Sequence, residues 1–188
     1  MKKTNRGFTL IELFIVISII SIIATMAIPG ILSARRSANA GVAMGNLKAF
    51  STAMATYQND NENQYYPKRI GDTKGPDCGN YFSHLSIKNG YKYEYYVDGT
   101  NADDNTANRG KYIYVAYPTT FNNGRKAYYV DENSKIWEND FSNETSWTAP
   151  ADATIDFTII PIVDTTDGKT QTAGPVTILG GTTWIQKS

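Results

Sequence analysis

The first pattern along the chain is a continuous apolar run over residues 8–28, interrupted by one carboxylate, Glu12. Its other polar positions carry uncharged hydroxyl groups, at Thr9, Ser18, Ser21 and Thr25. In an α-helix, a run of this length spans roughly 31 Å, which is enough to cross the hydrocarbon core of a bilayer. Basic residues precede the run, and such residues favour the cytoplasmic side. The pattern therefore predicts a membrane-spanning helix with its N-terminal end in the cytoplasm.

Helical periodicity continues beyond the apolar run, across Pro29-Gly30. Because proline removes one backbone hydrogen bond and crowds the preceding turn, we expect a kink or local melting there, rather than the end of the helix. Over residues 31–57, apolar side chains recur at spacings of 4, 3, 4 and 3 and form one stripe suited to packing on a globular head: Ala43, Leu47, Phe50, Met54 and Tyr57.

The opposite face of the same segment is small and polar, and carries Ala34, Ala38, Gly41, Gly45, Lys48, Thr52 and Thr56. Mid-helix glycine costs about 1 kcal/mol relative to alanine, but small residues also let another helix approach closely. Two interpretations stay open, a solvent-exposed face and a contact surface for neighbouring helices.

The pattern changes after Tyr57, where residues 58–64 are polar and turn-prone and end the helix. A short helix over Tyr81–Ile87, ended by Asn89-Gly90, is a candidate element. Runs of β-favouring residues then predict an antiparallel meander of three or four strands: Tyr91–Val97, Lys111–Tyr117, Lys126–Val130 and Lys135–Trp137. Further β segments at 155–163, 175–179 and 183–185, with a hairpin at Asp167-Gly168, extend the same sheet or form a small appendage.

Glu12 is the residue that most requires an explanation. A charged side chain within a membrane helix costs about 2.5–3.5 kcal/mol on insertion scales, so it usually has a partner. No Lys, Arg or His lies between Glu12 and Arg35. If the chain is cleaved between Gly7 and Phe8, the new α-amine of Phe8 is a cation one helical turn from Glu12. In a pack of such helices, this amine could meet the carboxylate of a neighbour.

The motif Gly7-Phe8-Thr9-Leu10-Ile11-Glu12 matches residue for residue the G-F-T-L-I-E signature that precedes an apolar helix in prepilins. The chain therefore resembles the type IV pilin and pseudopilin family, over about residues 1–57. Pro29 also falls where many members carry proline. The resemblance implies an α+β, type IV pilin-like fold, with a long N-terminal helix, half hydrophobic and half amphipathic, packed on a small antiparallel β-sheet head.

Pattern and resemblance together divide the chain into five segments. These are a prepilin leader peptide, 1–7; a hydrophobic membrane and filament-core helix, 8–30; an amphipathic half-helix, 31–57; a β head, 58–140; and a β-rich C-terminal segment, 141–188. The resemblance implies that prepilin peptidase cleaves after Gly7 and methylates the Phe8 amine, and that Glu12 and Pro29 serve assembly.

The implied function is that of a structural subunit of a type IV pilus or pilus-like filament, in which copies of the chain assemble through their helices. The implied partners are other copies of the chain, prepilin peptidase, the pilus assembly machinery and the inner membrane before assembly. The final location is a cell-surface filament or a periplasmic pseudopilus. Alternatives are a minor pilin or pseudopilin that acts as an adhesion or binding module, and a pseudopilin of type II secretion.

Two readings outside the family also stay open. One is an uncleaved single-pass protein whose Glu12 pairs with another membrane protein. The other is a secretory signal peptide with a weak cleavage site at Thr25-Met26-Ala27, although Glu12 and the length of the run disfavour it.

Composition excludes several functions. Lys+Arg and Asp+Glu are 18 each, and removing Lys2, Lys3 and Arg6 with the leader leaves 15 basic groups against 18 acidic ones. A mildly acidic mature chain gives no support to nucleic-acid binding. Phosphate-binding loops, metal-spaced Cys/His clusters and nucleophile elbows are missing from the sequence, so we expect neither an enzyme nor a cofactor.

The remaining candidates are weaker. Cys78 is the one cysteine, so an intrachain disulfide is excluded, and a buried thiol is favoured over intermolecular pairing. His84 is the one histidine, and a structural role is favoured. The acidic loop Asp98–Asn105 offers oxygen ligands for Ca²⁺ but lacks EF-hand spacing, which favours a solvated turn. Asn143-Glu144-Thr145 fits a glycosylation sequon. Cross-strand packing explains the 13 tyrosines.

Overall fold

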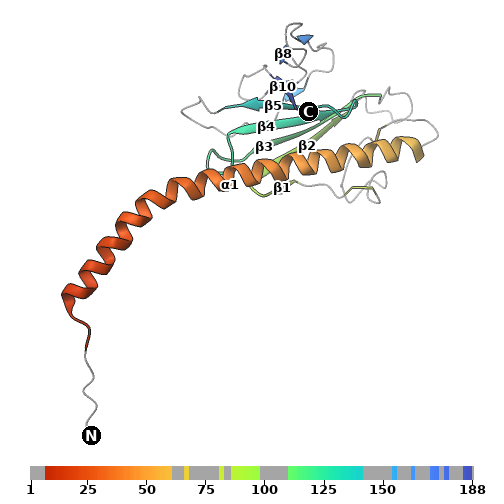
Figure 1. Ribbon diagram of the computed structural model, residues 1–188. Coiled ribbons are helices and arrows are strands. Elements are labelled where there is room, and N and C mark those ends of the chain that lie inside the picture. The colour runs from red at the N-terminus through yellow and green to blue at the C-terminus, as the bar shows by residue number, and fades with distance from the viewer. Residues whose placement is uncertain are drawn as a thin grey trace. The chain divides into compact units, whose positions relative to one another are not determined.

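A computed structural model describes residues 7–60, 66–67, 81–82, 86–97, 110–141, 154–155, 162–163, 170–173, 176–177 and 184–187. The chain divides into two compact units, Met1–Arg35 and Arg36–Ser188. Helix α1, Leu10–Asp60, contributes its first half to unit 1 and its second half to unit 2 (Figure 1). The two units are described separately.

Unit 1 is the apolar half of α1, and its large hydrophobic side chains are exposed along the whole run from Leu10 to Ile31. The hydroxyl groups within it bond to carbonyls of the preceding turn. Ser18 Oγ donates to Phe14 O at 2.8 Å, and Ser21 Oγ donates to Ile17 O at 2.7 Å. Because these hydroxyls are satisfied within the helix, they cost little in an apolar medium. By length and composition, α1 can cross a membrane.

Pro29 lies inside α1, and the helix continues without a break through Pro29 and Gly30. The prediction that the helix does not end at Pro29 is confirmed, and the alternative of local melting is not found. The kink expected at Pro29-Gly30 stays a prediction. The cost of proline is confined to one missing N–H donor, because the flanking residues keep helical hydrogen bonding on both sides. The predicted end of the helix near Tyr57 or a few residues later is also confirmed, at Asp60.

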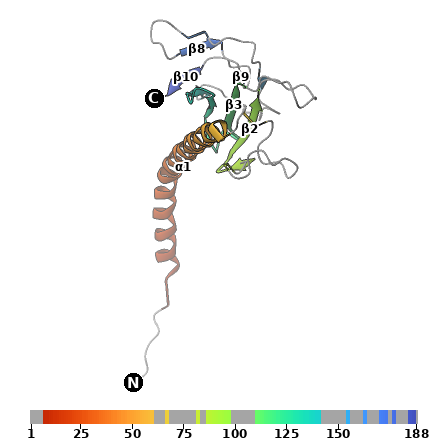
Figure 2. The same cartoon turned by 90° about the vertical axis from the view of Figure 1, so that its right-hand side faces the viewer.

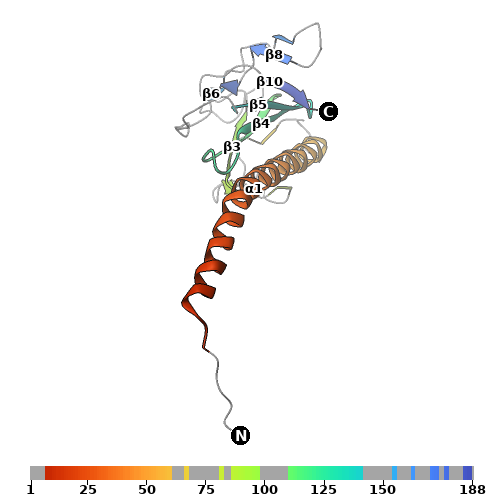
Figure 3. The same cartoon turned by 60° about the vertical axis from the view of Figure 1, so that its left-hand side comes forward.

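Unit 2 is built on an antiparallel sheet of eight strands in the order β1-β2-β3-β4-β5-β10-β8-β7. The strands are β1 Ile87–Lys88, β2 Tyr91–Val97, β3 Tyr112–Pro118, β4 Lys126–Asp131, β5 Ile136–Asp140, β7 Ile162–Val163, β8 Thr170–Ala173 and β10 Trp184–Lys187. Strands β6, Thr154–Ile155, and β9, Val176–Thr177, pair separately. Figure 3 shows β10 beside β5, with β8 beyond it.

The second half of α1 packs on one face of this sheet, as the apolar stripe predicts (Figure 2). Ala43, Leu47, Phe50 and Met54 are fully buried, and Tyr57 packs against the same cluster. The Phe50 ring stacks on Tyr114 with ring centroids 4.0 Å apart. Aromatic pairs of this kind add about 0.5–1.5 kcal/mol each beyond the area they bury.

Polar side chains of α1 fix the helix along the sheet at several points. Asn39 Nδ2 donates to Asn123 O at 3.0 Å, and Asn46 Nδ2 donates to the Tyr93 hydroxyl at 2.9 Å. Further along, Ser51 Oγ donates to Ser134 Oγ at 2.7 Å. Because these contacts lie at both ends of the sheet and in its middle, they set the position of the helix along the strands.

The opposite face of the sheet carries a second core, which the sequence pattern did not predict. Its buried members are Ile113, Val115, Tyr117, Ala127, Tyr129, Trp137, Phe141 and Trp184. Trp184 reaches this core from β10 and meets the Tyr129 ring edge-on, with centroids 4.7 Å apart. Strand β3 is therefore buried on both faces, whereas a sheet covered on one face has alternating exposure.

The strands of the predicted meander are found within a few residues of their expected bounds, but the helix proposed over Tyr81–Ile87 is wrong at its end. Ile87 lies in β1, and Asn89-Gly90 forms the two-residue turn that joins β1 to β2. Both turn residues have positive φ, 50° and 74°. Asn-Gly is the preferred pair for such hairpin turns, so it joins strands here instead of ending a helix.

Both alternatives predicted for the C-terminal β segments, extension of the main sheet and a small appendage, are found. Strands β7, β8 and β10 extend the main sheet, whereas β6 and β9 form a small separate pair. The single run expected over 155–163 is wrong, because Ile155 and Ile162 lie in different sheets. The antiparallel pairing of β7 with β8 agrees with the hairpin expected between these two strands. Asp167-Gly168, Cys78, His84, Asp98–Asn105 and the Asn143 sequon lie outside the described residues.

Candidate assembly site at the start of the helix

Helix α1 begins with a reciprocal set of hydrogen bonds between Thr9 and Glu12. The Thr9 backbone N–H and the Thr9 hydroxyl both donate to Glu12 Oε2, at 2.8 and 2.6 Å. The Glu12 N–H donates back to Thr9 Oγ1 at 3.3 Å. Thr9 O accepts the first helical bond, from Leu13 N at 3.3 Å. Thr9 is therefore the N-cap of α1, and Glu12 closes a capping box with it.

The sequence contains a signal for this capping box, the spacing Thr-x-x-Glu directly before an apolar run. The interpretation of Glu12 as a charge that needs a cationic partner does not include the role of Thr9 as the N-cap. A capping box satisfies two of the N–H groups that a helix start leaves without intrahelical partners. It also places a carboxylate where the helix dipole favours negative charge. The capping box is thus a local structural role for Glu12.

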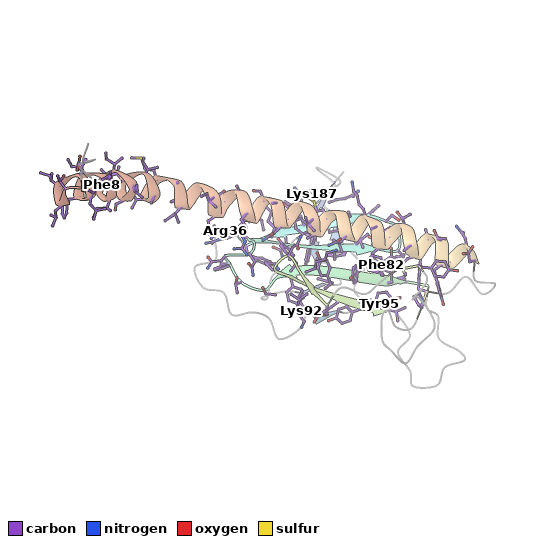
Figure 4. The ribbon with its side chains drawn as sticks, turned by 90° about the horizontal axis from the view of Figure 1, so that it is seen from below. Phe8, Arg36, Phe82, Lys92, Tyr95 and Lys187 are labelled. Carbon is purple, nitrogen blue, oxygen red and sulfur yellow. The ribbon has the colours of Figure 1, made fainter. Side chains whose placement is uncertain are left out.

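Gly7, Phe8 and Glu12 all lie at this helix start, and none of them is covered by other described residues. Phe8 is 83% exposed, and Gly7 has open space around it. Figure 4 marks Phe8 at this end of α1. The peptide bond between Gly7 and Phe8 precedes the cap by one residue, in a segment without regular structure. The predicted cleavage point therefore lies outside the helix, between two exposed residues.

The Glu12 carboxylate keeps capacity for a further donor. A carboxylate offers about four acceptor positions on two oxygens. Both bonds from Thr9 go to Oε2, and Glu12 is exposed, so Oε1 accepts no hydrogen bond from the described residues. An ammonium group from a second chain can therefore bind Oε1 without breaking the capping box, since charge-assisted bonds of this kind are the stronger ones.

Pro29 does not belong to this site. It lies 17 residues after Glu12 on the same helix, which corresponds to roughly 26 Å of rise. Within the residues that the structure describes, no group of three or more His, Cys, Asp or Glu side chains could hold a metal ion.

These features define a class of protein in which a helix carries an α+β head. The first half of that helix is apolar and exposed. That helix starts with an accessible Gly-Phe bond and a Thr-Glu cap. The prokaryotic N-terminal methylation motif matches residues 2–28. No solved structure matches the fold.

Three of the curated relatives match between 31% and 43% of the chain. The type IV wide pilus major component PilA4 of Thermus thermophilus is 47% identical over 59 residues, 31% of this chain and 45% of the relative. The type IV major pilin protein PilA of Myxococcus xanthus is 37% identical over 81 residues, 43% of this chain and 36% of the relative. The type II secretion system core protein G of Pseudomonas aeruginosa is 37% identical over 60 residues, 32% of this chain and 42% of the relative.

These matches cover less than half the length of each relative. They agree with the methylation motif and with the α+β architecture, and they confirm the resemblance of the N-terminal region to type IV pilins and type II secretion pseudopilins.

Proposed function

We propose that the chain is a structural subunit of a type IV pilus or a pilus-like filament, including the pseudopilus of type II secretion. The observation that carries the proposal is the exposed apolar half of α1, which begins at an accessible Gly7-Phe8 bond and a Glu12 carboxylate with a free acceptor face. Prepilin peptidase would cleave after Gly7 and methylate the Phe8 amine. The methylation motif supports both steps, and the similarity to two type IV pilins and a type II secretion core protein G agrees with them.

Before assembly, the apolar half of α1 would hold the subunit in the inner membrane as a single-pass protein. In the filament, the same half would lie in the core with copies of itself. Burying the exposed isoleucine, leucine and valine side chains between helices is worth about 25 cal/mol per Å² relative to water. The heads would then form the outer surface of a cell-surface filament, or of a periplasmic pseudopilus.

Glu12 would neutralise the Phe8 amine of a neighbouring subunit during assembly. The geometry supports this role, because the bonds from Thr9 occupy Oε2 and leave Oε1 to accept the amine in the filament. Pro29 would serve assembly as the point where α1 lacks one N–H donor and unwinds most easily. The five-segment division of the chain, with borders after residues 7, 30, 57 and 140, belongs to the same proposal.

Partners of the subunit would be its own copies, prepilin peptidase and the pilus assembly machinery. We propose no catalytic role, no cofactor and no nucleic-acid partner. A minor pilin or pseudopilin that acts as an adhesion module is the second candidate. Its abundance in purified filaments separates it from a main structural subunit, because a minor component is present at a small fraction of the filament mass.

The test separates the two roles of Glu12, capping and charge. Glu12→Gln keeps a capping box, since Gln also serves at that position, but removes the charge. Thr9→Ala keeps the charge and removes the cap hydroxyl, which costs about 0.5–2 kcal/mol of helix stability. Thr9→Ser is the matched control that retains the hydroxyl.

We expect Glu12→Gln and Glu12→Ala to reduce sheared filaments equally and strongly, while Thr9→Ala reduces them mildly and Thr9→Ser not at all. Near-UV circular dichroism should show a folded head in each variant. Wild-type filament yield from Glu12→Gln would contradict the charge role. N-terminal mass spectrometry of the same filaments tests processing, with a chain beginning at methylated Phe8 expected and a chain beginning at Met1 contradicting it.

A further inference from the structure

One end of unit 2 gathers basic and apolar side chains from three elements. The β1–β2 turn, the β3–β4 loop over residues 119–125 and the first turn of α1 within the unit meet there. Thr119 N donates to Gly90 O at 2.8 Å, and Asn39 Nδ2 donates to Asn123 O at 3.0 Å. We call this end the loop-end surface and define it by Arg36, Ile87, Lys88, Phe121, Asn122 and Arg125. Figure 4 marks Arg36 there, with Phe82 and Tyr95 toward the other end of unit 2.

The apolar members of the loop-end surface are Ile87, which is exposed, and Phe121, which is half-buried and also packs against the second core. Ile87 is 65% exposed, although β1 belongs to the main sheet. Phe121 is half-buried, and the Arg125 guanidinium lies over its ring at 4.3 Å from the centroid. An arginine stacked on an aromatic ring holds a charge and an apolar surface side by side. This combination is typical of residues that settle at the headgroup level of a bilayer.

The basic members of the loop-end surface are Arg36, Lys88 and Arg125, and other lysines of the described sheet are paired with carboxylates. Lys92 pairs with Glu94 at 2.7 Å. Lys126 pairs with Glu138 at 2.9 Å and with Asp140 at 3.5 Å. Among the described residues, Arg36 and Lys88 form no ion pair that would offset their charge.

Chain continuity keeps this surface close to the bilayer in the membrane-anchored subunit. The exposed apolar run of α1 ends at Ile31, and Arg36 follows five residues later, which is about 7.5 Å of helix. The headgroup layer on each side of the hydrocarbon core is about 5–7 Å thick. Arg36 therefore lies near the outer limit of the headgroups, and Asn39, which holds the β3–β4 loop, lies within one further turn.

We propose that the loop-end surface docks on anionic phospholipid headgroups while the subunit is in the membrane. The basic side chains bind the headgroup phosphates, and Ile87 and Phe121 enter the interface beside them. Each Lys or Arg near an anionic surface strengthens such binding roughly fivefold. The proposed docking rests on the proposed function, because it needs the apolar half of α1 in the bilayer. It would hold the head in one orientation before assembly.

The test uses the full chain in dilute vesicles of phosphatidylcholine, with and without phosphatidylglycerol. A nitroxide label at Asn122→Cys, in a Cys78→Ser background, reports whether the loop is in water or among headgroups through its collisions with a water-soluble nickel relaxant. A label at Lys135→Cys, in the exposed β4–β5 turn at the opposite end of the sheet, is the matched control. A label at Ile20→Cys reports whether α1 is in the bilayer.

We expect several-fold fewer relaxant collisions at position 122 in anionic vesicles than in neutral ones, and no change at position 135. The pair Lys88→Glu and Arg125→Glu should abolish the protection. Reversing two lysines at the opposite end, Lys111→Glu and Lys135→Glu, changes the net charge equally and should leave the protection intact in the 122-labelled chain. Lys88→Glu alone, at an exposed position, should weaken docking by at least about fivefold.

Water exposure of position 122 in anionic vesicles, with position 20 in the bilayer, would overturn the docking and leave the proposed function standing. Equal protection in neutral and anionic vesicles would also overturn it, as would protection that appears only at high protein density, which would mark a second copy of the chain as the occupant. A label at position 20 that stays in water would overturn the membrane anchor of the proposed function, and the docking with it.

Discussion

At one end of the sheet, two glycines lie so close to neighbouring side chains that a larger residue would not fit. Gly124 faces the Tyr91 ring, and a Cβ built there would lie 2.5 Å from the Tyr91 hydroxyl oxygen. That hydroxyl donates to Lys126 O at 2.9 Å and is therefore not free to move away. Gly90 has φ of 74° and faces Asn123. These glycines let the β1–β2 turn and the β3–β4 loop approach each other.

Gly124→Ala is expected to lower the free energy of unfolding by about 1–3 kcal/mol, because the new methyl group overpacks against Tyr91. Urea denaturation of the full chain in detergent measures the change. Gly110→Ala is the matched control, since a Cβ at Gly110 meets no atom within 4 Å. Equal stability of the two variants would contradict the close packing at Gly124.

Buried tyrosines couple the stability of the head to alkaline pH. Burial raises the pKa of Tyr91, Tyr112 and Tyr128, and raises the pKa of Tyr117 to about 12. The hydrogen bond to Glu138 raises the pKa of Lys126 in the same direction. These groups bind their protons more tightly in the folded chain than in the unfolded chain. Their contribution is therefore complete below about pH 10 and is lost as the pH rises further.

We therefore expect the free energy of unfolding to fall steeply between about pH 10 and about pH 12, because unfolding then releases tyrosine protons. Urea denaturation at a series of pH values measures the slope. Tyr128→Phe should flatten it, and Tyr81→Phe, at a position that is 37% exposed, should not. A free energy that stays constant over this range would contradict the inferred burial.

At the scale of elements, one helix meets two different surroundings. The first half of α1 exposes apolar side chains throughout, whereas the second half buries a narrow stripe and exposes the small polar face opposite. Gly41 and Gly45 on that face are exposed and have open space around them. The two halves differ because a continuous apolar surface suits lipid or helix packing, and a single stripe suits one sheet.

Phe50→Ala should lower the free energy of unfolding by about 3–5 kcal/mol, because the substitution removes a fully buried ring and leaves a cavity. The ring contacts Tyr95, Tyr112, Tyr114 and Phe82. Denaturant melts followed by near-UV circular dichroism measure the loss. Thr52→Ala, on the exposed face of the same helix, should change stability by no more than about 0.5 kcal/mol. Similar effects of the two substitutions would contradict the packing of α1 on the sheet.

For unit 2 as a whole, strand β10 ties the C-terminal part of the chain to the predicted meander. It pairs with β5, and it brings Trp184 into the second core. Lys187 Nζ binds Glu138 Oε1 at 3.0 Å, and Lys126 binds the same oxygen at 2.9 Å. The buried Glu138 carboxylate is thus held by lysines from two strands on either side of β5. The meander and β10 therefore form one cooperative unit.

Trp184→Ala is expected to destabilise the head by about 3–5 kcal/mol, since the indole is fully buried. The loss should appear in a single unfolding transition that also includes β2–β5. Ile185→Ala is the control, at a neighbouring position that is 45% exposed. A separate early transition for the C-terminal part, with the meander unchanged, would show that β10 is an independent appendage.

Several elements could be predicted because their signals are local. Periodicities of 3.6 and 2 identified α1 and strands β2 to β4 nearly to their bounds, and the Gly-Phe-Thr-Leu-Ile-Glu motif placed Gly7, Phe8 and Glu12 at one helix start. The Asn89-Gly90 hairpin and the Thr9–Glu12 capping box also have local signals. They were missed because Asn89-Gly90 was interpreted as the end of a helix and Glu12 as an isolated charge.

The sequence by itself determined the apolar helix, its amphipathic continuation, the meander and the residues at the helix start, because each depends on neighbours a few positions away. The tertiary structure alone decided the strand order β5-β10-β8-β7 and the second core that buries both faces of β3. It also decided the junction of α1, the β1–β2 turn and the β3–β4 loop at the loop-end surface. The pairing of β5 with β10 and the contacts at the loop-end surface join residues 29 to 84 positions apart. No local period specifies which distant segments bury each other.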